Sequence, residues 1–171
     1  MLERLNVGAI DFRHVGQLPP IFAQATGANF AHLGHGEPAP RAQALIVPGN
    51  PPIGAVADPK DKKVALKRGS NVHDLMVRLI GKHGLSHSDV QPVFVPPAEA
   101  RPAFERGSVD ACVIWDPFTA AAQQETGARG IADRTGMVNN DAFFLGKRNL
   151  ASQRPEVITD LFDVLQQTGQ R

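Results

Sequence analysis

Residues 63–117 read KVALKRGSNVHDLMVRLIGKHGLSHSDVQPVFVPPAEARPAFERGSVDACVIWDP, a stretch in which one pattern recurs three times. Each repeat has a short apolar run, then a turn, then a segment long enough for a helix. Such a succession is typical of α/β domains with a largely parallel sheet. The stretch therefore predicts a doubly wound lobe, with strands at 64–66, 93–95 and 111–114 and helices at 72–83, 98–106 and 118–125.

The first of these helices shows the packing pattern most clearly. Its apolar positions are Leu75, Met76, Leu79 and Ile80. Spacings of three and four place these side chains on one stripe, which faces a sheet. In doubly wound sheets, ligands bind beyond the carboxyl ends of the strands. A ligand site is therefore expected at the turns that follow the strands, at 69–71, 96–97 and 115–117.

The turn at 69–72 has the composition of an anion site. Gly69 allows a ligand to approach the backbone closely, and the N–H groups and dipole at the start of the next helix attract negative charge. Ser70, Asn71 and Val72 are therefore candidate ligand contacts. The alternative is that Ser70 or Asn71 only caps its own helix, as most serines at helix starts do.

Two further candidate sites lie at other turns. Trp115 ends an apolar run, where its flat side chain could cover the hydrocarbon part of a ligand or could pack between sheet and helix. Asp116, the next residue, could cap the helix that follows. Gly16 and Gln17 lie in a loop that enters a helix, and a glutamine amide both donates and accepts hydrogen bonds. A plain connecting turn is the alternative for Gly16 and Gln17.

The flanking segments supply the remaining elements. Residues 5–12 form either a strand, or the end of a helix followed by a strand. Pro19 and Pro20 open a helix, because proline is tolerated in a first helical turn. We further expect helix at 21–25, strands at 30–33, 44–47 and 142–145, a short helical turn near 53–57, and a closing amphipathic helix at 154–167.

Composition excludes several classes of function. The chain has 171 residues with a net charge of +1, so nothing indicates a nucleic-acid surface. A single cysteine, Cys112, rules out an internal disulfide framework and any multi-cysteine zinc site. No metal-ligand, nucleophile-elbow or P-loop motif occurs, and the histidines are scattered. We therefore expect no catalytic residues, no metal and no cofactor. No signal for export precedes the first patterned segment, so the chain as written is expected to stay cytoplasmic.

At these turns the sequence resembles the aliphatic sulfonate-binding proteins of bacterial ABC importers. The matching motifs occur in the order and spacing of that family, namely GQLPPIFAQA (16–25), KKVALKRGSNVH (62–73), PPAEAR (96–101), FERGSVDA (104–111), VIWDP (113–117) and NDAFFL (140–145). The resemblance implies a type II periplasmic-binding-protein fold with two doubly wound lobes. By comparison with the family, the chain is expected to be truncated at both ends, which leaves the first lobe incomplete. We expect residues 1–60 in that partial first lobe, 61–138 in the second lobe, and 139–171 returning to the first with the closing helix.

The resemblance also implies a function. The chain would be the substrate-binding component of an importer for alkanesulfonates such as taurine, periplasmic by family, with permease and ATPase subunits as partners. Its ligand contacts would be Gly16, Gln17, Ser70, Asn71, Val72, Trp115 and Asp116. A sulfonate stays ionised at physiological pH, so such a site needs hydrogen-bond donors and no proton partner.

Three other functions remain open on the same scaffold. One is an enzyme, such as a pyrimidine-precursor synthase or a desulfinase, which requires a reactive histidine or cysteine facing the ligand. Exposure of Cys112 beside Ser70 would favour it, and burial of Cys112 under the sheet would argue against it. The others are the effector-binding domain of a regulator, and a remnant that binds nothing.

Overall fold

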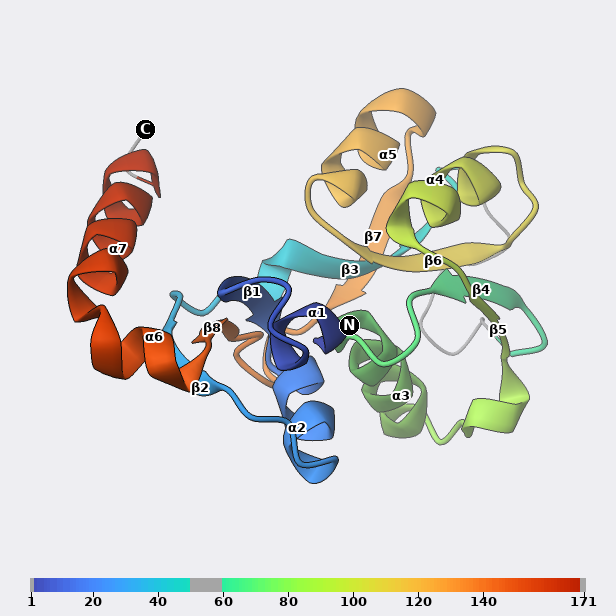
Figure 1. The fold of residues 1–171 in the computed structure, drawn as a ribbon. Helices are drawn as coiled ribbons and strands as arrows, with labels where there is room; N and C mark the ends of the chain where they lie inside the picture. Colours follow the sequence, from blue (N-terminus) through green and yellow to red (C-terminus); the bar gives the residue numbers. More distant parts are fainter. Residues whose placement is uncertain (1, 50–59, 170–171) are drawn as a thin grey trace. The chain divides into compact units, whose positions relative to one another are not determined.

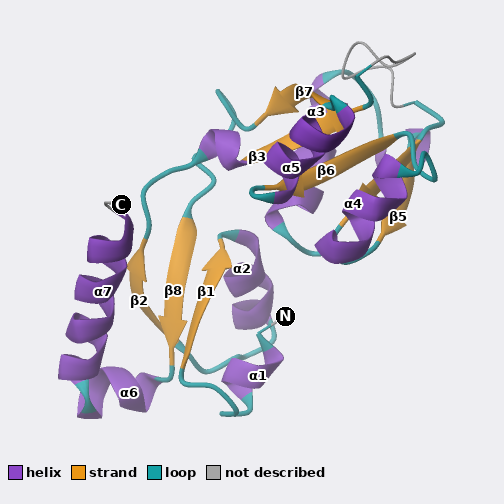
Figure 2. Cartoon of the chain, turned by 90° about the horizontal axis from the view of Figure 1, so that it is seen from above, coloured by secondary structure: helices purple, strands orange, loops and turns teal. Residues whose placement is uncertain are grey.

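The computed structural model describes residues 2–49 and 60–169. The chain divides into two compact units (Figures 1 and 2). The larger unit is continuous and comprises residues 39–140, whereas the smaller unit combines residues 1–38 with residues 141–171. The helical turn expected near 53–57 lies outside the described residues.

The larger unit is built on a five-stranded sheet of order β5-β4-β6-β3-β7. Strand β4 runs parallel to both β5 and β6, whereas β3 runs antiparallel to its neighbours β6 and β7. The prediction of a largely parallel sheet holds for β5, β4 and β6, whereas both pairings of β3 are antiparallel. The strands span Gln43–Val47 (β3), Lys63–Leu66 (β4), Gln91–Phe94 (β5), Ala111–Trp115 (β6) and Arg129–Asp133 (β7).

Helices cover both faces of this sheet (Figure 1). Helix α3 (Asn71–Lys82) packs on the face that carries Val64, Leu66 and Val113. Helices α4 (Pro97–Glu105) and α5 (Phe118–Thr126) pack on the opposite face, against the alternate strand residues Ala65, Cys112 and Ile114. Short 3₁₀ turns lie at Pro40–Ala42 and His87–Asp89. This alternation follows from the two-residue period of a strand, which sends successive side chains to opposite faces.

Helix α3 buries the stripe that its sequence predicts. Leu75, Met76, Leu79 and Ile80 are between 0% and 3% exposed. Full burial of each such side chain contributes about 1.5–3 kcal/mol. The helix is therefore anchored firmly along its length, and its N-terminus at Asn71 is held against the end of β4.

The smaller unit contains a three-stranded antiparallel sheet of order β1-β8-β2 (Figure 2). Leu2, Leu5, Val15, Phe30 and Leu145 form its buried core. Of the two alternatives for residues 5–12, the helix followed by a strand is the nearer, although the strand begins only at Phe12. The elements are α1 (Glu3–Asn6), β1 (Phe12–Gly16), α2 (Leu18–Ala25), β2 (Ala31–His35), β8 (Ala142–Gly146), α6 (Arg148–Gln153) and α7 (Pro155–Gly169).

The structure places the first boundary between units earlier in the chain than the sequence suggested. We expected residues 39–60 in the first lobe, but β3 belongs to the sheet of the larger unit. The reason is that β3 pairs on both sides, with β6 and with β7, and all five of its residues are buried. The second boundary falls at 140/141, close to the expected 138/139.

Candidate functional site

The candidate site in the larger unit is the N-terminus of α3. Gly69 has a φ of +67°, a left-handed conformation that glycine adopts without strain. Ser70 follows as the N-cap residue in an extended conformation, but its side chain makes no capping hydrogen bond. Its hydroxyl instead donates to the carbonyl oxygen of Lys67 at 2.7 Å. The alternative in which the Ser70 side chain caps its own helix is therefore wrong, whereas the backbone carbonyl oxygen of Ser70 accepts from the N–H of His73 at 3.0 Å.

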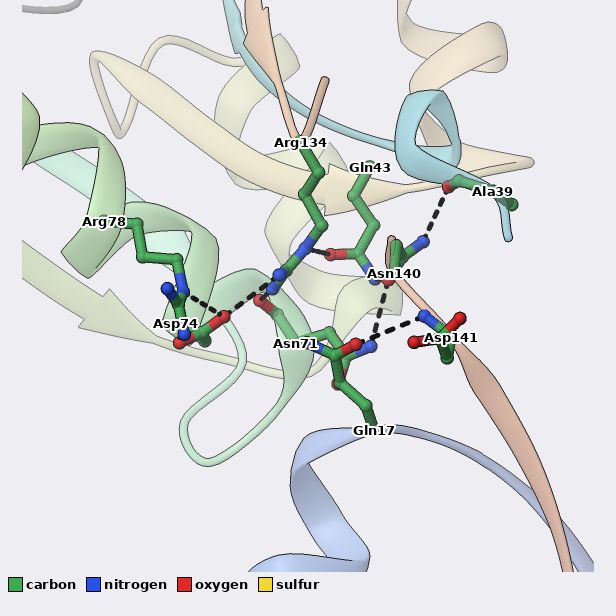
Figure 3. Close-up of polar contacts among 9 residues, drawn as sticks. All are labelled: Gln17, Ala39, Gln43, Asn71, Asp74, Arg78, Arg134, Asn140 and Asp141. Atoms are coloured by element: carbon green, nitrogen blue, oxygen red, sulfur yellow. Dashed lines mark hydrogen bonds and ion pairs between the residues drawn. The ribbon is translucent and has the colours of Figure 1, made fainter. Parts of the chain in front are cut away.

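The side chain of Asn71 is held by a second amide. Asn71 is 6% exposed, and its Nδ2 donates to Oδ1 of Asn140 at 3.0 Å (Figure 3). The same oxygen accepts from Nε2 of Gln43 at 2.6 Å, and Nδ2 of Asn140 donates to the carbonyl oxygen of Ala39 at 2.8 Å. Asn140 thus connects α3 with β3 and with the segment before it.

A buried cation lies behind the same turn. The side chain of Arg134 is 0% exposed. Its Nη1 donates to Oδ2 of Asp74 at 3.0 Å, its Nε donates to Oε1 of Gln43 at 3.0 Å, and its Nη2 donates to the carbonyl oxygen of Asn71 (Figure 3). Burial lowers the pKa of the Arg134 guanidinium, and the hydrogen bond to Asp74 opposes that change. An arginine remains charged in proteins, so the turn has a fixed positive charge behind it.

The carboxylate of Asp74 only partly compensates this charge. Both of its oxygens also accept from Nε of Arg78 at 2.9 Å. Two guanidinium groups therefore share one carboxylate, and the group of three has a net charge of +1. Together with the positive end of the α3 dipole, this charge favours an anion at the turn.

The His73 side chain also stabilises the turn, through a hydrogen bond with Gly69. The backbone N–H of Gly69 donates to its Nδ1 at 3.3 Å, which requires that nitrogen to be unprotonated. The His73 ring packs edge-on against Phe94, with ring centroids 5.3 Å apart. Burial lowers the pKa of His73, and the nearby His87 and Arg68 lower it further. The neutral imidazole is therefore part of the turn's structure.

The other candidates of this unit differ in what they can offer. The Val72 side chain is 0% exposed and packs in the core, so only its backbone can meet a ligand. Trp115 is half-buried at the end of β6 and packs against the core on the α3 face, which agrees in part with the packing alternative. Because β4 and β6 are parallel, Trp115 and the 69–72 turn lie at the same edge of the sheet. Asp116 is exposed, and its Oδ1 accepts from the N–H of Ala120 at 3.3 Å, a capping contact to α5.

Gly16 and Gln17 belong to the smaller unit. Gly16 ends β1 and Gln17 is the N-cap residue of α2. The Gln17 side chain makes no capping bond, and its Oε1 accepts from the backbone N–H of Asp141 at 3.2 Å. The amide is thereby oriented, with its NH₂ group on the side away from this bond.

Sequence reasoning missed Gln43, Asp74, Arg134 and Asn140 as parts of the site. Arg134 and Asn140 lie in the aperiodic segment between β7 and β8, and Gln43 lies in a strand that we had assigned to the other lobe. No local spacing connects these residues, since their contacts join distant segments. A buried arginine surrounded by amides can be found only from the tertiary structure.

The described residues offer little for metal or nucleophilic chemistry. Among them, no group of three or more His, Cys, Asp or Glu side chains is placed to hold a metal ion. Cys112 is fully buried under the sheet, and burial raises the pKa of its thiol to about 12. Within the same part of the chain, no helix is long and apolar enough to cross a membrane.

The chain has the type II periplasmic-binding-protein fold, and the larger unit has helices on both faces of its sheet. The chain belongs to the NMT1-like family, which matches residues 50–171. It is 44% identical over 153 residues to an Escherichia coli (strain K12) protein named for binding aliphatic sulfonates; the match covers 90% of this chain and 48% of that protein.

Solved structures show the same relationship. The alkanesulfonate-binding protein SsuA from Xanthomonas axonopodis pv. citri, bound to MOPS, superposes with a TM-score of 0.89 at 40% identity, over 97% of this chain and 57% of that one. The periplasmic aliphatic sulphonate-binding protein SsuA from Escherichia coli gives a TM-score of 0.82 at 42% identity, over 94% and 52%. The chain thus spans about half the length of the relatives it matches.

Proposed function

We propose that this chain is part of the substrate-binding component of an ABC importer and that it binds an aliphatic sulfonate at the N-terminus of α3. One observation carries the proposal: the Ser70 hydroxyl donates to Lys67 and does not cap α3, so the N–H of Val72 receives no side-chain cap from Ser70. The names of the relatives at 40–44% identity supply the ligand class. The proposed location is the periplasm, the location given in the name of the Escherichia coli structure, and the proposed partners are the permease and ATPase subunits of the importer.

The chemistry of a sulfonate suits this turn. Its three oxygens share one negative charge that no physiological pH removes, so the site has to supply donors. The backbone N–H groups of Ser70 and Val72 and the side-chain amide of Asn71 are the donors that we assign to it, with the α3 dipole and the Arg134 charge behind them. Such a site requires no nucleophile, base, metal, cofactor or nucleic acid.

Trp115 is assigned to the organic part of the ligand. It lies at the same sheet edge as the turn and is only half-buried, so part of its side chain can contact an alkyl tail. Asp116 has an exposed carboxylate, which would repel the sulfonate at close range. We therefore assign Asp116 to the tail end, where it caps α5. Gly16 and Gln17 are further proposed contacts, on the strength of the family resemblance alone.

Burial excludes Cys112 as the nucleophile that the enzymatic alternative requires. Cys112 packs among Ala65, Ile114 and neighbouring apolar residues, away from solvent. At a pKa of about 12, its thiol has almost no reactive thiolate at neutral pH. A binding function without chemistry therefore fits the described residues better.

Calorimetric titration of the folded chain tests the proposal. The probes are ethanesulfonate, taurine and MOPS, with sulfate and nitrate as inorganic anions. Saturable heat with a sulfonate, and weaker binding of nitrate, is the expected result. If a sample with the far-ultraviolet circular dichroism of an α/β protein gives no heat with any sulfonate, the proposed function is wrong for this chain.

A further inference from the structure

Arg134 is the one fully buried charge among the described residues of the larger unit, and it touches the binding turn only through a carbonyl. Burying a guanidinium is expensive unless its hydrogen-bonding groups are satisfied. Here three different acceptors satisfy it: the Asp74 carboxylate, the Gln43 amide and the Asn71 carbonyl. The three acceptors come from α3 and β3, so the guanidinium fixes the first turn of α3 relative to the sheet.

The contact with Asn71 has a consequence on the far side of the same peptide group. The carbonyl of Asn71 and the N–H of Val72 belong to one planar unit, and in a trans peptide they point in opposite directions. Fixing the carbonyl oxygen therefore also fixes the direction of the Val72 N–H. A charged donor on the carbonyl also polarises the peptide, which makes its N–H a stronger donor to an anion.

Asn140 fixes the side chain of Asn71 in a similar way. Its Oδ1 accepts from Asn71 Nδ2, so the amide of Asn71 is held in one orientation. Oδ1 of Asn140 also accepts from Nε2 of Gln43, and Oε1 of Gln43 accepts from Nε of Arg134. One chain of hydrogen bonds thus determines both the backbone and the side chain at the start of α3 (Figure 3).

We propose that Arg134 and Asn140 are positioning residues, which pre-orient the Val72 N–H and the Asn71 amide for the sulfonate without touching it. This inference rests on the proposed function, because the groups being positioned are its ligand contacts. The gain comes from preorganisation: a donor already aimed at the ligand loses no conformational freedom on binding.

Two substitutions isolate the role. Arg134→Lys keeps the charge but loses the planar fork that reaches three acceptors at once. Asn140→Gly removes only the amide, because Asn140 has a φ of +56°, which glycine adopts without strain. Arg78→Lys is the matched control, since Arg78 also binds Asp74 but has a half-exposed side chain that makes no contact with the turn.

The first measurement needs no ligand. Heteronuclear NMR of the ligand-free chain follows the amide hydrogen exchange of the hydrogen-bonded N–H groups within residues 69–73, those of Gly69 and His73, with β6 as the internal reference. Arg134→Lys and Asn140→Gly should speed exchange at 69–73 about tenfold or more and leave β6 unchanged, whereas Arg78→Lys should change neither. Unchanged exchange at 69–73, or an equal increase throughout the unit, would overturn the positioning role.

The second measurement is the affinity for ethanesulfonate. Loss of one charged hydrogen bond to the turn should weaken binding about tenfold in Arg134→Lys. Wild-type affinity in both variants, despite faster exchange at 69–73, would show that the turn's order does not serve binding. If the wild-type chain binds no sulfonate, the proposed function fails, and the exchange result still decides whether these residues order the turn. Should Arg134→Lys fail to fold, Asn140→Gly carries both measurements.

Discussion

Because the Ser70 side chain does not cap α3, one pair of substitutions at this position is especially informative. Replacing Ser70 by Asp places a carboxylate at the N-cap position, and replacing it by Asn places a neutral amide of the same shape there. Both side chains can cap the helix, and both abolish the hydroxyl bond to Lys67. Any steric cost at this site, which is only 5% exposed, is shared by the two variants. The difference between them is therefore the charge.

The size of that difference follows from geometry. A sulfonate hydrogen-bonded to the first-turn N–H groups would lie roughly 4 Å from a carboxylate at position 70, and two unit charges at that distance repel by about 4 kcal/mol at an effective dielectric constant of 20. This corresponds to roughly a thousandfold difference in affinity. Folding responds in the opposite direction, because the α3 dipole favours Asp over Asn at the helix start by about 0.3–1 kcal/mol.

Two assays on the same pair check this. Calorimetry with ethanesulfonate should show Ser70→Asp binding at least a hundredfold more weakly than Ser70→Asn, and urea unfolding should show Ser70→Asp to be no less stable. An affinity ratio below about tenfold would refute an anion at this turn, since a like charge so close cannot be that well screened.

Four further predictions follow from other residues. Trp115→Ala should reduce the affinity for octanesulfonate much more than that for sulfate in calorimetry, because each buried methylene contributes about 0.8 kcal/mol; equal losses would mean that the indole does not touch the tail. Because the folded pKa of His73 lies below its ordinary value of 6.5, protonation favours the unfolded chain, so the contribution of His73 to stability should be constant above that pH and fall below it. Urea unfolding at about pH 8 and about pH 5 should show a smaller loss for His73→Gln than for the wild type. Cys112, with a pKa of about 12, should react with iodoacetamide only in denaturant, and labelling of the native chain within minutes would contradict its burial. Leu79→Ala should lower the free energy of unfolding by about 2–5 kcal/mol, whereas Val77→Ala on the exposed face of α3 should change it by less than about 0.5 kcal/mol.

The local elements of the larger unit could be read from the sequence. Helix α3 was expected at 72–83 and spans Asn71–Lys82, because its apolar spacing has only one good interpretation. The strand at Ala111–Trp115 was predicted to within one residue. The apolar spacing within such elements predicts which side chains are buried, and the family resemblance predicted the fold that the elements form.

What the sequence could not provide were relations between distant segments. The apolar run of β3 indicates a strand, but nothing in it shows that its partners are β6 and β7. The role of Ser70 stayed open for a similar reason, because the choice between capping and donating to Lys67 depends on the rotation of one hydroxyl group. Arg134 gave no signal at all, since a single arginine in an aperiodic loop is usually solvated.

The position of β8 has a consequence for how the chain folds during synthesis. This strand lies between β1 and β2 and pairs with both, yet it is made long after them. Strands β1 and β2 therefore leave the ribosome before β8, and the larger unit is translated between them. That unit is continuous in sequence and can fold in the interval. The smaller unit pairs β1 and β2 with β8 only once Gly146 has emerged, so a pause or cleavage before that point would leave the edges of β1 and β2 that face β8 unpaired and open to aggregation.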